Sequence, residues 1–430
     1  MASRELLWNG KKYSVFSNKL ASILPFFLLL FSLQILYAKT IHVGPNHTIK
    51  KIKQAIAISV DGDTILIVKG IYKEGNIVIR KKLNIIGIDN PILDGEKLSE
   101  IFTISANNFL VKGITFKNSG YSSMEDFGSI KIIDATNFKL ENNTIINASF
   151  AIHISNCSDF SIKNNIITGS PREEQNTGNG IHLWKSSKAN ISGNKVSGHR
   201  DGIYLEFVSD SELKDNLSSN NIRYGLHFMF SNNDTYTHNT FTDNGAGVAV
   251  MFSQHVYMYS NTFENNLGAS AYGILLKEIS DGEISKNVFK NNTIGILMEG
   301  TSRLKVKNNR FEKNGWGFRI QASCSDITVV ENNFTGNTFD IATNGTLVLN
   351  KFDNNYWDKY EGYDLNKDGK GDVPFHPVSM FAMITEEMPY SIILYRSFMV
   401  MLLERAEKAM PSITPIDLKD NSPLMKAIVL

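Results

Sequence analysis

Cysteine and net charge are both scarce in this sequence. Only Cys157 and Cys324 occur among 430 residues, and neither belongs to a CxxC pair. We therefore expect both to be small buried residues, with metal ligation as the alternative. The formal charge is +1, from 44 basic and 43 acidic residues, and this balance argues against nucleic acid as the main partner.

A glycine returns at nearly regular intervals and opens a short segment in which apolar residues alternate. The steps between successive members are 22 to 26 residues. The glycines are Gly180, Gly202, Gly225, Gly247, Gly273, Gly295 and Gly317. A fixed period in this range predicts a solenoid whose repeats contact mainly their neighbours. The alternation predicts strands with one face in the core.

A second marker, Asn-x-hydrophobic, follows most of these glycines, as at Asn239, Asn261 and Asn309. Stacked asparagines can hydrogen-bond from one repeat to the next and cap turns. Repeats this short hold two or three strands and no helix, and the leucine spacing of leucine-rich repeats is absent. We therefore predict an all-β fold, a right-handed parallel β-helix. Its two cysteines would stand about seven coils apart, too far to bridge.

The sequence divides into four predicted regions. Residues 1–38 resemble an export signal, because basic residues precede an apolar run that ends near Ala38. An uncleaved membrane anchor is the alternative, and either places the body outside the cytoplasm. We predict a strand and a capping helix at residues 39–62, and we predict the β-helix at residues 63–355. Residues 356–430 predict an Asp-rich loop and a Met-rich helix over Tyr390–Ala409, which could cap the solenoid or dock on a membrane protein.

The Asp-rich loop resembles the first half of a calcium-binding loop. Its oxygen-bearing residues are Asp364, Asn366, Asp368 and Asp372, and the twelfth position is Phe375 instead of an acid. Bound calcium and a metal-free turn are both compatible with this pattern.

Three coils contain extra residues relative to the repeat, at 119–128, 170–179 and 268–272. Insertions at one corner of a solenoid tend to line one face.

The repeat places outward residues of neighbouring coils in columns. The first column is His153, His182, Tyr204, His227, Ala249 and Leu275, and the second is Ser155, Trp184, Glu206, Met229, Met251 and Lys277. Neighbouring coils lie about 4.8 Å apart, and same-face neighbours in a strand about 6.6–7 Å apart. Met229 should therefore stack on Met251, with His227 beside Met229.

Thioether and imidazole ligands suit Cu(I), and imidazole also suits Cu(II). We predict a copper site, with Cu(I) favoured, at His227, Met229 and Met251, with Glu206, His182 and His153 as further candidates. The alternative is an apolar patch that the C-terminal segment or a partner covers, on a metal-free scaffold.

An acid–base cluster is a different interpretation of the same face. Its members are His182, His199, Arg200, Asp201, Tyr204 and Glu206. Polysaccharide lyases and epimerases with a β-helix fold need such groups on an exposed sheet. Methionine and leucine in the later coils disfavour this enzyme.

Three strand segments of the repeat are distinctive. They are Asp201-Gly-Ile-Tyr-Leu-Glu-Phe, Arg223-Tyr-Gly-Leu-His-Phe-Met-Phe-Ser and Gly245-Ala-Gly-Val-Ala-Val-Met-Phe-Ser. Together they resemble the corresponding strands of the NosD family. Asn354-Asn-Tyr-Trp-Asp, the Asp-rich loop and Leu402-Leu-Glu-Arg-Ala-Glu are similar to the family's C-terminal portion. The resemblance extends over essentially the whole chain after the signal.

The resemblance implies a periplasmic copper-binding accessory protein of denitrification rather than an enzyme. It implies action with a membrane ABC permease and its cytoplasmic ATPase in the maturation of the copper centres of nitrous oxide reductase. It also implies a copper-chaperone lipoprotein upstream, and contact with the membrane only through the permease, made by the C-terminal helix.

Overall fold

The computed structural model describes residues 38–122, 126–170, 173–174, 177–347, 349–410 and 418–429. The predicted export signal, residues 1–38, lies outside this described part except for Ala38. From Thr40 onward the chain forms one compact unit. No helix in the described ranges is long and apolar enough to cross a membrane.

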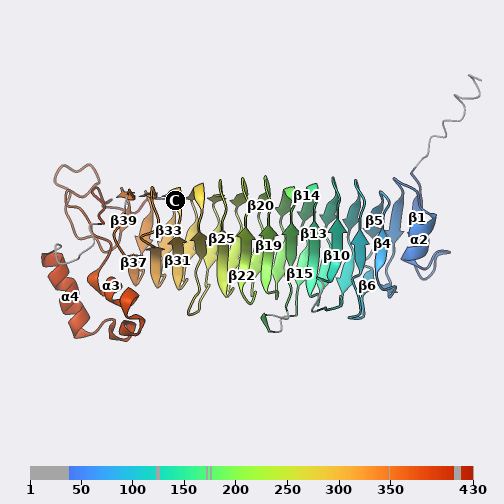
Figure 1. The fold of residues 1–430 in the computed structure, drawn as a ribbon, viewed down its shortest axis with the longest axis horizontal. Helices are drawn as coiled ribbons and strands as arrows, with labels where there is room; N and C mark the ends of the chain where they lie inside the picture. The colour runs from blue at the N-terminus through green and yellow to red at the C-terminus, as the bar shows by residue number, and fades with distance from the viewer. Residues whose placement is uncertain are drawn as a thin grey trace, which may run out of the picture. The chain divides into compact units, whose positions relative to one another are not determined.

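Three parallel sheets run the length of this unit, and successive coils contribute one strand to each (Figure 1). The architecture is the predicted right-handed parallel β-helix. Each sheet follows chain order along the stack, so residues one coil apart are direct neighbours.

The 14-stranded sheet contains β1 (Thr40–Val43), β2 (Thr64–Ile67), β5 (Asn84–Gly87), β8 (Leu110–Lys112), β11 (Lys139–Glu141), β14 (Ser158–Lys163), β17 (Ser187–Ser192), β20 (Glu212–Lys214), β23 (Thr235–Thr237), β26 (Tyr257–Tyr259), β29 (Ser280–Ser285), β32 (Ser302–Lys307), β35 (Thr328–Val330) and β38 (Lys351–Asp353). The 13-stranded sheet contains β3 (Ile71–Tyr72), β6 (Ile92–Asp94), β9 (Thr115–Lys117), β12 (Thr144–Ile146), β15 (Ile166–Thr168), β18 (Lys195–Ser197), β21 (Leu217–Ser219), β24 (Thr240–Thr242), β27 (Thr262–Glu264), β30 (Val288–Lys290), β33 (Arg310–Glu312), β36 (Asn333–Thr335) and β39 (Tyr356–Trp357).

The 12-stranded sheet carries the candidate site. It contains β4 (Ile77–Ile79), β7 (Phe102–Ile104), β10 (Gly128–Ile133), β13 (Phe150–Ser155), β16 (Ile181–Trp184), β19 (Asp201–Glu206), β22 (Tyr224–Met229), β25 (Ala246–Met251), β28 (Ile274–Lys277), β31 (Ile294–Glu299), β34 (Trp316–Ile320) and β37 (Phe339–Ala342).

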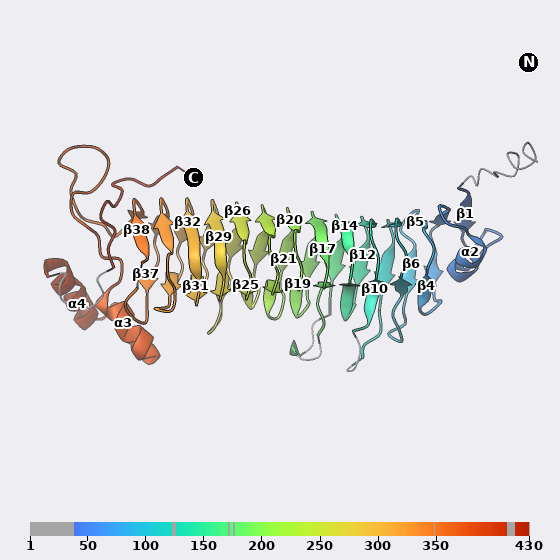
Figure 2. The ribbon, with the colours of Figure 1, turned by 45° about the horizontal axis from the view of Figure 1, so that its top comes forward.

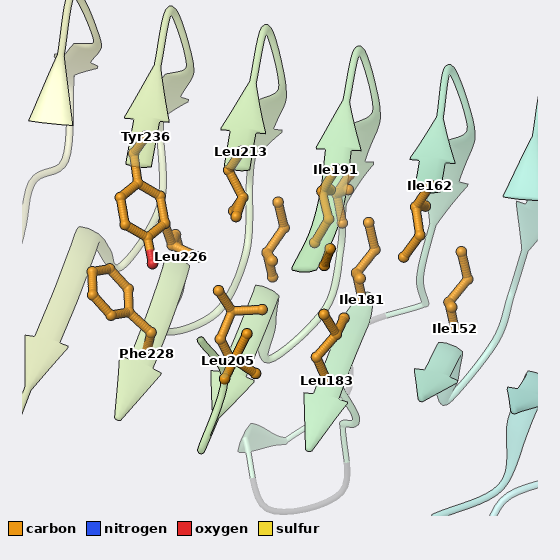
Figure 3. Packing of buried hydrophobic residues seen from close by; sticks show 14 of the residues in the cluster. Ile152, Ile162, Ile181, Leu183, Ile191, Leu205, Leu213, Leu226, Phe228 and Tyr236 are labelled. Atoms are coloured by element: carbon orange, nitrogen blue, oxygen red, sulfur yellow. The ribbon is translucent and has the colours of Figure 1, made fainter. Parts of the chain in front are cut away.

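The inward residues of the three sheets form one continuous core. Figure 3 shows how Ile152, Ile181 and Leu205 from successive coils point into it, with Tyr236 and Phe228 further along. Both cysteines are free and buried, as predicted. Burial raises the pKa of the Cys157 thiol to about 11 and also raises that of Cys324.

A ladder of buried asparagines stabilises one corner of the solenoid. In each step the backbone and side-chain N–H groups of one asparagine donate to Oδ1 of the asparagine one coil further on, as from Asn239 to Asn261 at 2.9 and 3.0 Å. The members are Asn143, Asn165, Asn194, Asn216, Asn239, Asn261, Asn287, Asn309, Asn332 and Asn355. The predicted stacking of the Asn marker is therefore confirmed, and it satisfies polar groups that the turns would otherwise bury unpaired.

Additional elements lie at both ends of the stack. At the N-terminal end, α2 (Ile52–Ile58) buries Ile52, Ala55 and Ile56. At the other end are α3 (Met380–Glu387), the 3-10 helix η2 (Pro389–Leu394) and α4 (Phe398–Ala409) (Figures 1 and 2). The prediction of one helix over residues 390–409 is wrong. Arg396 adopts φ 64°, and the Ser397 side chain caps α4 by accepting from the Val400 N–H, so a new helix begins there.

The described end of the chain returns along the coils. Asp420 pairs with the backbone of Phe375 and lies beside the last coil, where its carboxylate accepts the N–H groups of Asn355. Ile428 exchanges two hydrogen bonds with the Asn333 side chain at 2.7 and 2.9 Å. The segment 418–429 thus covers the end of the asparagine ladder.

Candidate functional site

Strand pairing brings together the two columns that the repeat predicted. In the first column His153 pairs with His182, His182 with Tyr204, and Tyr204 with His227. In the second, Trp184 pairs with Glu206, Glu206 with Met229, and Met229 with Met251. Both columns lie on the outer face of the 12-stranded sheet, since their strand neighbours fill the core.

The first column is more buried than an open sheet would leave it. His182 and His227 are only 8% and 5% exposed. Residues of the insertions before β10 and β28 reach toward the column. An Asp126 carboxylate oxygen lies 3.9 Å from His153 Nε2, and the Tyr272 hydroxyl lies 3.2 Å from that of Tyr224, whose ring packs on His227. Residues of two insertions therefore lie against part of this face, where His182 and His227 are sheltered from solvent.

A buried carboxylate holds His227 in place. Asp201 has no exposed surface, and Arg223 donates to both of its oxygens, at 2.9 and 2.5 Å. His227 Nδ1 lies 3.4 Å from Asp201 Oδ2 and 3.3 Å from an Arg223 nitrogen. Burial by itself would raise the pKa of Asp201, but hydrogen bonds from His227 and Arg223 and the charge of Arg223 lower it overall.

This arrangement leaves the other ring nitrogen of His227 available as a ligand. Because arginine can only donate, the Asp201 carboxylate is the neighbour that can accept a proton from His227 Nδ1. In that tautomer Nε2 carries a lone pair, and Nε2 is buried without a hydrogen-bond partner among the described residues. Carboxylate–histidine pairs of this kind orient metal-binding histidines in many proteins. The sequence indicated Asp201 only as a member of an acid–base cluster, and its role beside His227 was not predicted.

Two half-buried thioethers lie beside His227. Met229 and Met251 are Cα partners in β22 and β25, and both are partly exposed on the outer face. The Tyr204 hydroxyl lies 3.9 Å from Met229 Sδ, and Glu206 pairs with Met229 from the coil before. One histidine, two methionines and one carboxylate therefore share a small area at the ends of three strands.

Three stacked phenylalanines border the methionines and were missed in the sequence. Phe207, Phe230 and Phe252 directly follow Glu206, Met229 and Met251, and their rings stack at 5.1 Å. All three have φ between 51° and 54°, which is rare for bulky residues. Their spacing of 23 and 22 residues was visible in the sequence.

His153 and His182 form a second group, separate from His227. The ring of Tyr204 lies between those of His182 and His227, at centroid distances of 4.8 and 4.9 Å. His182 and His227 are therefore two coil steps apart, which is about 10 Å. The six candidate copper ligands therefore divide into a methionine group (Glu206, His227, Met229 and Met251) and a histidine pair (His153 and His182).

The Asp-rich loop uses its oxygens to form turns. Asp364 accepts the N–H groups of Lys367, Asp368 and Gly369, and Asp372 accepts that of Leu365. Asn366 and Asp368 likewise accept N–H groups within the loop. Phe375, in the place of the missing acid, packs against Trp357 at 5.4 Å. A carboxylate oxygen that accepts an N–H group keeps a further lone pair, so bound calcium and a metal-free turn are both compatible with these contacts.

The acid–base cluster does not assemble as an exposed catalytic sheet. His199 is fully buried, and Asp201 is engaged by Arg223. Burial and then the neighbouring Glu206 carboxylate raise the pKa of Tyr204 to about 12, which opposes its use as a base. These contacts favour a binding role for the face.

Comparisons with known proteins place this chain near one protein family and one fold. A sequence model of the family described as "Periplasmic copper-binding protein (NosD)" matches residues 164–367, and one described as "Right handed beta helix region" matches residues 44–188. Two curated relatives bear the name "Probable ABC transporter binding protein NosD". The one from Stutzerimonas stutzeri is 27% identical over 82% of this chain and 85% of its own length. The one from Pseudomonas aeruginosa is 26% identical over 82% of this chain and 86% of its own length.

Solved structures show likeness in fold alone. The catalytic unit of an α-1,3-glucanase from Streptomyces thermodiastaticus superposes with a TM-score of 0.57 at 12% identity, covering 71% of this chain and 65% of its own. A polygalacturonase from Erwinia carotovora gives a TM-score of 0.52 at 14% identity, covering 73% of this chain and 96% of its own.

Proposed function

Because this chain belongs to the NosD family, we propose that it is an exported accessory protein that binds Cu(I) and passes it on during maturation of the copper centres of nitrous oxide reductase. The family is described as periplasmic and copper-binding, and the relatives are named for an ABC transporter. The proposed copper ligands are His227, Met229 and Met251, with Glu206 at the edge of the group.

The observation that carries this proposal is the buried Asp201–His227 pair beside two stacked methionines. The pair leaves His227 Nε2 without a partner in the described structure. Soft thioethers favour Cu(I) over divalent ions, and one imidazole with two thioethers gives a three-coordinate set. The partial exposure of Met229 and Met251 leaves the bound ion accessible to an acceptor.

Replacing both methionines tests the copper site. We expect Met229→Leu/Met251→Leu to weaken Cu(I) binding by at least about 100-fold, because leucine keeps the volume and removes the sulfur ligands. Affinity is measured by competition with a Cu(I) chelator under reducing conditions. Met258→Leu/Met298→Leu is the matched control, since these two methionines face the core. Equal affinity in the site variant and in the unmodified chain would reject the site.

The C-terminal helices provide the proposed contact with the ABC permease. Tyr390, Ile393 and Phe398, on η2 and α4, are 93%, 86% and 72% exposed. Met399, Met401 and Leu402 extend this apolar surface along α4. Exposed apolar patches rich in methionine are typical of surfaces that bind partners. At the inner side, Arg319 of β34 pairs with Glu386 of α3, and α3 packs beside β37.

Polar substitutions on these helices should separate docking from copper binding. We expect Ile393→Ser/Phe398→Ser to lower binding to vesicles that contain the cognate permease and ATPase by at least about tenfold, while Cu(I) affinity stays unchanged. Ile71→Ser/Leu98→Ser is the control, because these residues are 66% and 76% exposed near the N-terminal end of the coils. Equal vesicle binding by the two double variants would contradict the assignment.

A further inference from the structure

Three potential metal ligands converge near the histidine pair, away from the methionine group. Asp126, His153 and His182 each place one ligand atom within 4.8 Å of the others. The histidines come from β13 and β16 of the same column, and Asp126 comes from the insertion before β10. The two imidazole rings lie edge to face, with centroids 4.8 Å apart.

The imidazoles of this cluster have unused lone pairs. Both ring nitrogens of His182 and Nδ1 of His153 are buried without a hydrogen-bond partner in the described part of the chain. Burial lowers the pKa of His182 to about 3, and His153 and Arg200 contribute; burial also lowers the pKa of His153. Both rings are therefore neutral near pH 7, the form that binds metal ions.

Other polar residues of the same column have partners. Lys131, one coil before His153, pairs with Glu100 at 2.9 Å. His227 has Asp201, and Arg319 has Glu386. A buried polar group without a partner costs free energy, so the nitrogens of His182 call for an explanation. A bound cation would take the lone pair of one of these nitrogens.

We propose that Asp126, His153 and His182 form a divalent-metal site that favours Cu²⁺. Two imidazoles and one carboxylate suit borderline divalent ions, and Cu²⁺ binds such donors most tightly among the first-row divalent ions. Metal–ligand bonds of about 2.0 Å in a tetragonal Cu²⁺ site place neighbouring ligands roughly 2.8 Å apart, so the three ligand atoms, which lie within 4.8 Å of one another, need to close by up to about 2 Å. The partly exposed Asp126 leaves a side of the ion open to solvent.

This site goes beyond the proposed Cu(I) function and does not depend on it. The ligand types differ, and the ring of Tyr204 separates His182 from His227 by about 10 Å. The chain would then bind the two oxidation states at different places on one face. Each proposed site can be tested with variants that leave the ligands of the other site unchanged.

The test uses the exported chain, stripped of metal and titrated with Cu²⁺ in air. We expect one tight ion whose electron paramagnetic resonance spectrum shows coupling to two imidazole nitrogens. Asp126→Asn should weaken Cu²⁺ binding by about 10-fold or more, and the fold should survive because the Asp126 side chain is 52% exposed. His182→Gln should reduce the coupling to one nitrogen.

Three controls keep the outcome unambiguous. Asp159→Asn changes a comparably exposed carboxylate, and His42→Gln removes an exposed histidine at the N-terminal end. Met229→Leu/Met251→Leu should leave Cu²⁺ affinity unchanged, just as Asp126→Asn should leave Cu(I) affinity unchanged. The proposal is overturned if Asp126→Asn and His182→Gln bind Cu²⁺ like the unmodified chain, or if the double methionine variant loses Cu²⁺.

Discussion

The Asp234→Asn variant is expected to be more stable than the unmodified chain by roughly 4 kcal/mol at pH 7. Asp234 is fully buried at the turn before β23. Its Oδ1 accepts the Ser211 N–H at 2.9 Å, and Oδ2 has no hydrogen-bond partner among the described residues. Burial, with a smaller contribution from Asp210, raises its pKa from 3.8 to about 8.

The sign of the pH dependence follows from that raised pKa. The folded chain keeps Asp234 protonated, whereas the unfolded chain releases the proton above about pH 4. The protonated carboxyl therefore stabilises the fold fully below pH 4, and this contribution is lost as the pH rises from about 4 to 8. Over about 3 pH units up to pH 7, at 1.36 kcal/mol per unit, the loss is roughly 4 kcal/mol. Asparagine keeps the acceptor for Ser211 and cannot ionise.

Chemical denaturation at pH 5, 7 and 9 measures this effect. The advantage of Asp234→Asn should grow between pH 5 and 7 and level off above about pH 8. Asp215→Asn is the matched control, because Asp215 is an exposed carboxylate that does not contribute to the raised pKa of Asp234. A stability difference that does not change with pH would show that Asp234 is already ionised in the folded chain.

The Asp420→Ala variant should lose the C-terminal end of the fold. The Asp420 carboxylate accepts five N–H groups, at 2.9 to 3.1 Å. These come from Asn354, the backbone and side chain of Asn355, the Trp357 indole and Ser422. Alanine would leave several buried donors unpaired, and each costs about 1–3 kcal/mol. We expect the cap to lose at least about 4 kcal/mol of local stability.

Hydrogen exchange and Trp357 fluorescence should detect this loss. In Asp420→Ala, the backbone N–H groups of residues 418–429 and of Phe375 should exchange rapidly, while the central coils stay protected. Protection of the tail in Asp420→Asn should lie between that of the unmodified chain and that of Asp420→Ala, because an amide offers one acceptor oxygen instead of two. Asp368→Ala, in the exposed loop, is the control. Unchanged protection of the tail in Asp420→Ala would contradict the capping role.

The repeat predicted the fold and the columns because each coil obeys the same local rule. Once the glycines gave the phase, the placement of Met229 under Met251 required only counting, and strand pairing confirms it. The insertion contacts near the histidine column could not be derived from the repeat, because the insertions have no period. Asp126 and Tyr272 belong to such insertions, and their contacts depend on how the loops fold back.

Asp420 shows a second limit of sequence reasoning. It continues the asparagine ladder from 65 residues beyond Asn355, after the period has ended. Asp201 is a different case, since it directly precedes a marker glycine and its partner Arg223 stands 22 residues on. That pair followed the repeat and could have been found, but alternation alone did not suggest that the position before the glycine would be functional.

The coils between the methionine group and the C-terminal helices act as a spacer of adjustable length. Four strands of the 12-stranded sheet follow β25, from β28 to β37, and α3 packs beside the last. At about 4.8 Å per coil they set a reach of roughly 19 Å. Removal of one whole coil, residues 295–316, would shorten that reach by one step and leave Asn287 facing Asn332 in the ladder. Gain or loss of whole coils would therefore change the distance between the proposed copper site and the C-terminal helices in steps of one coil.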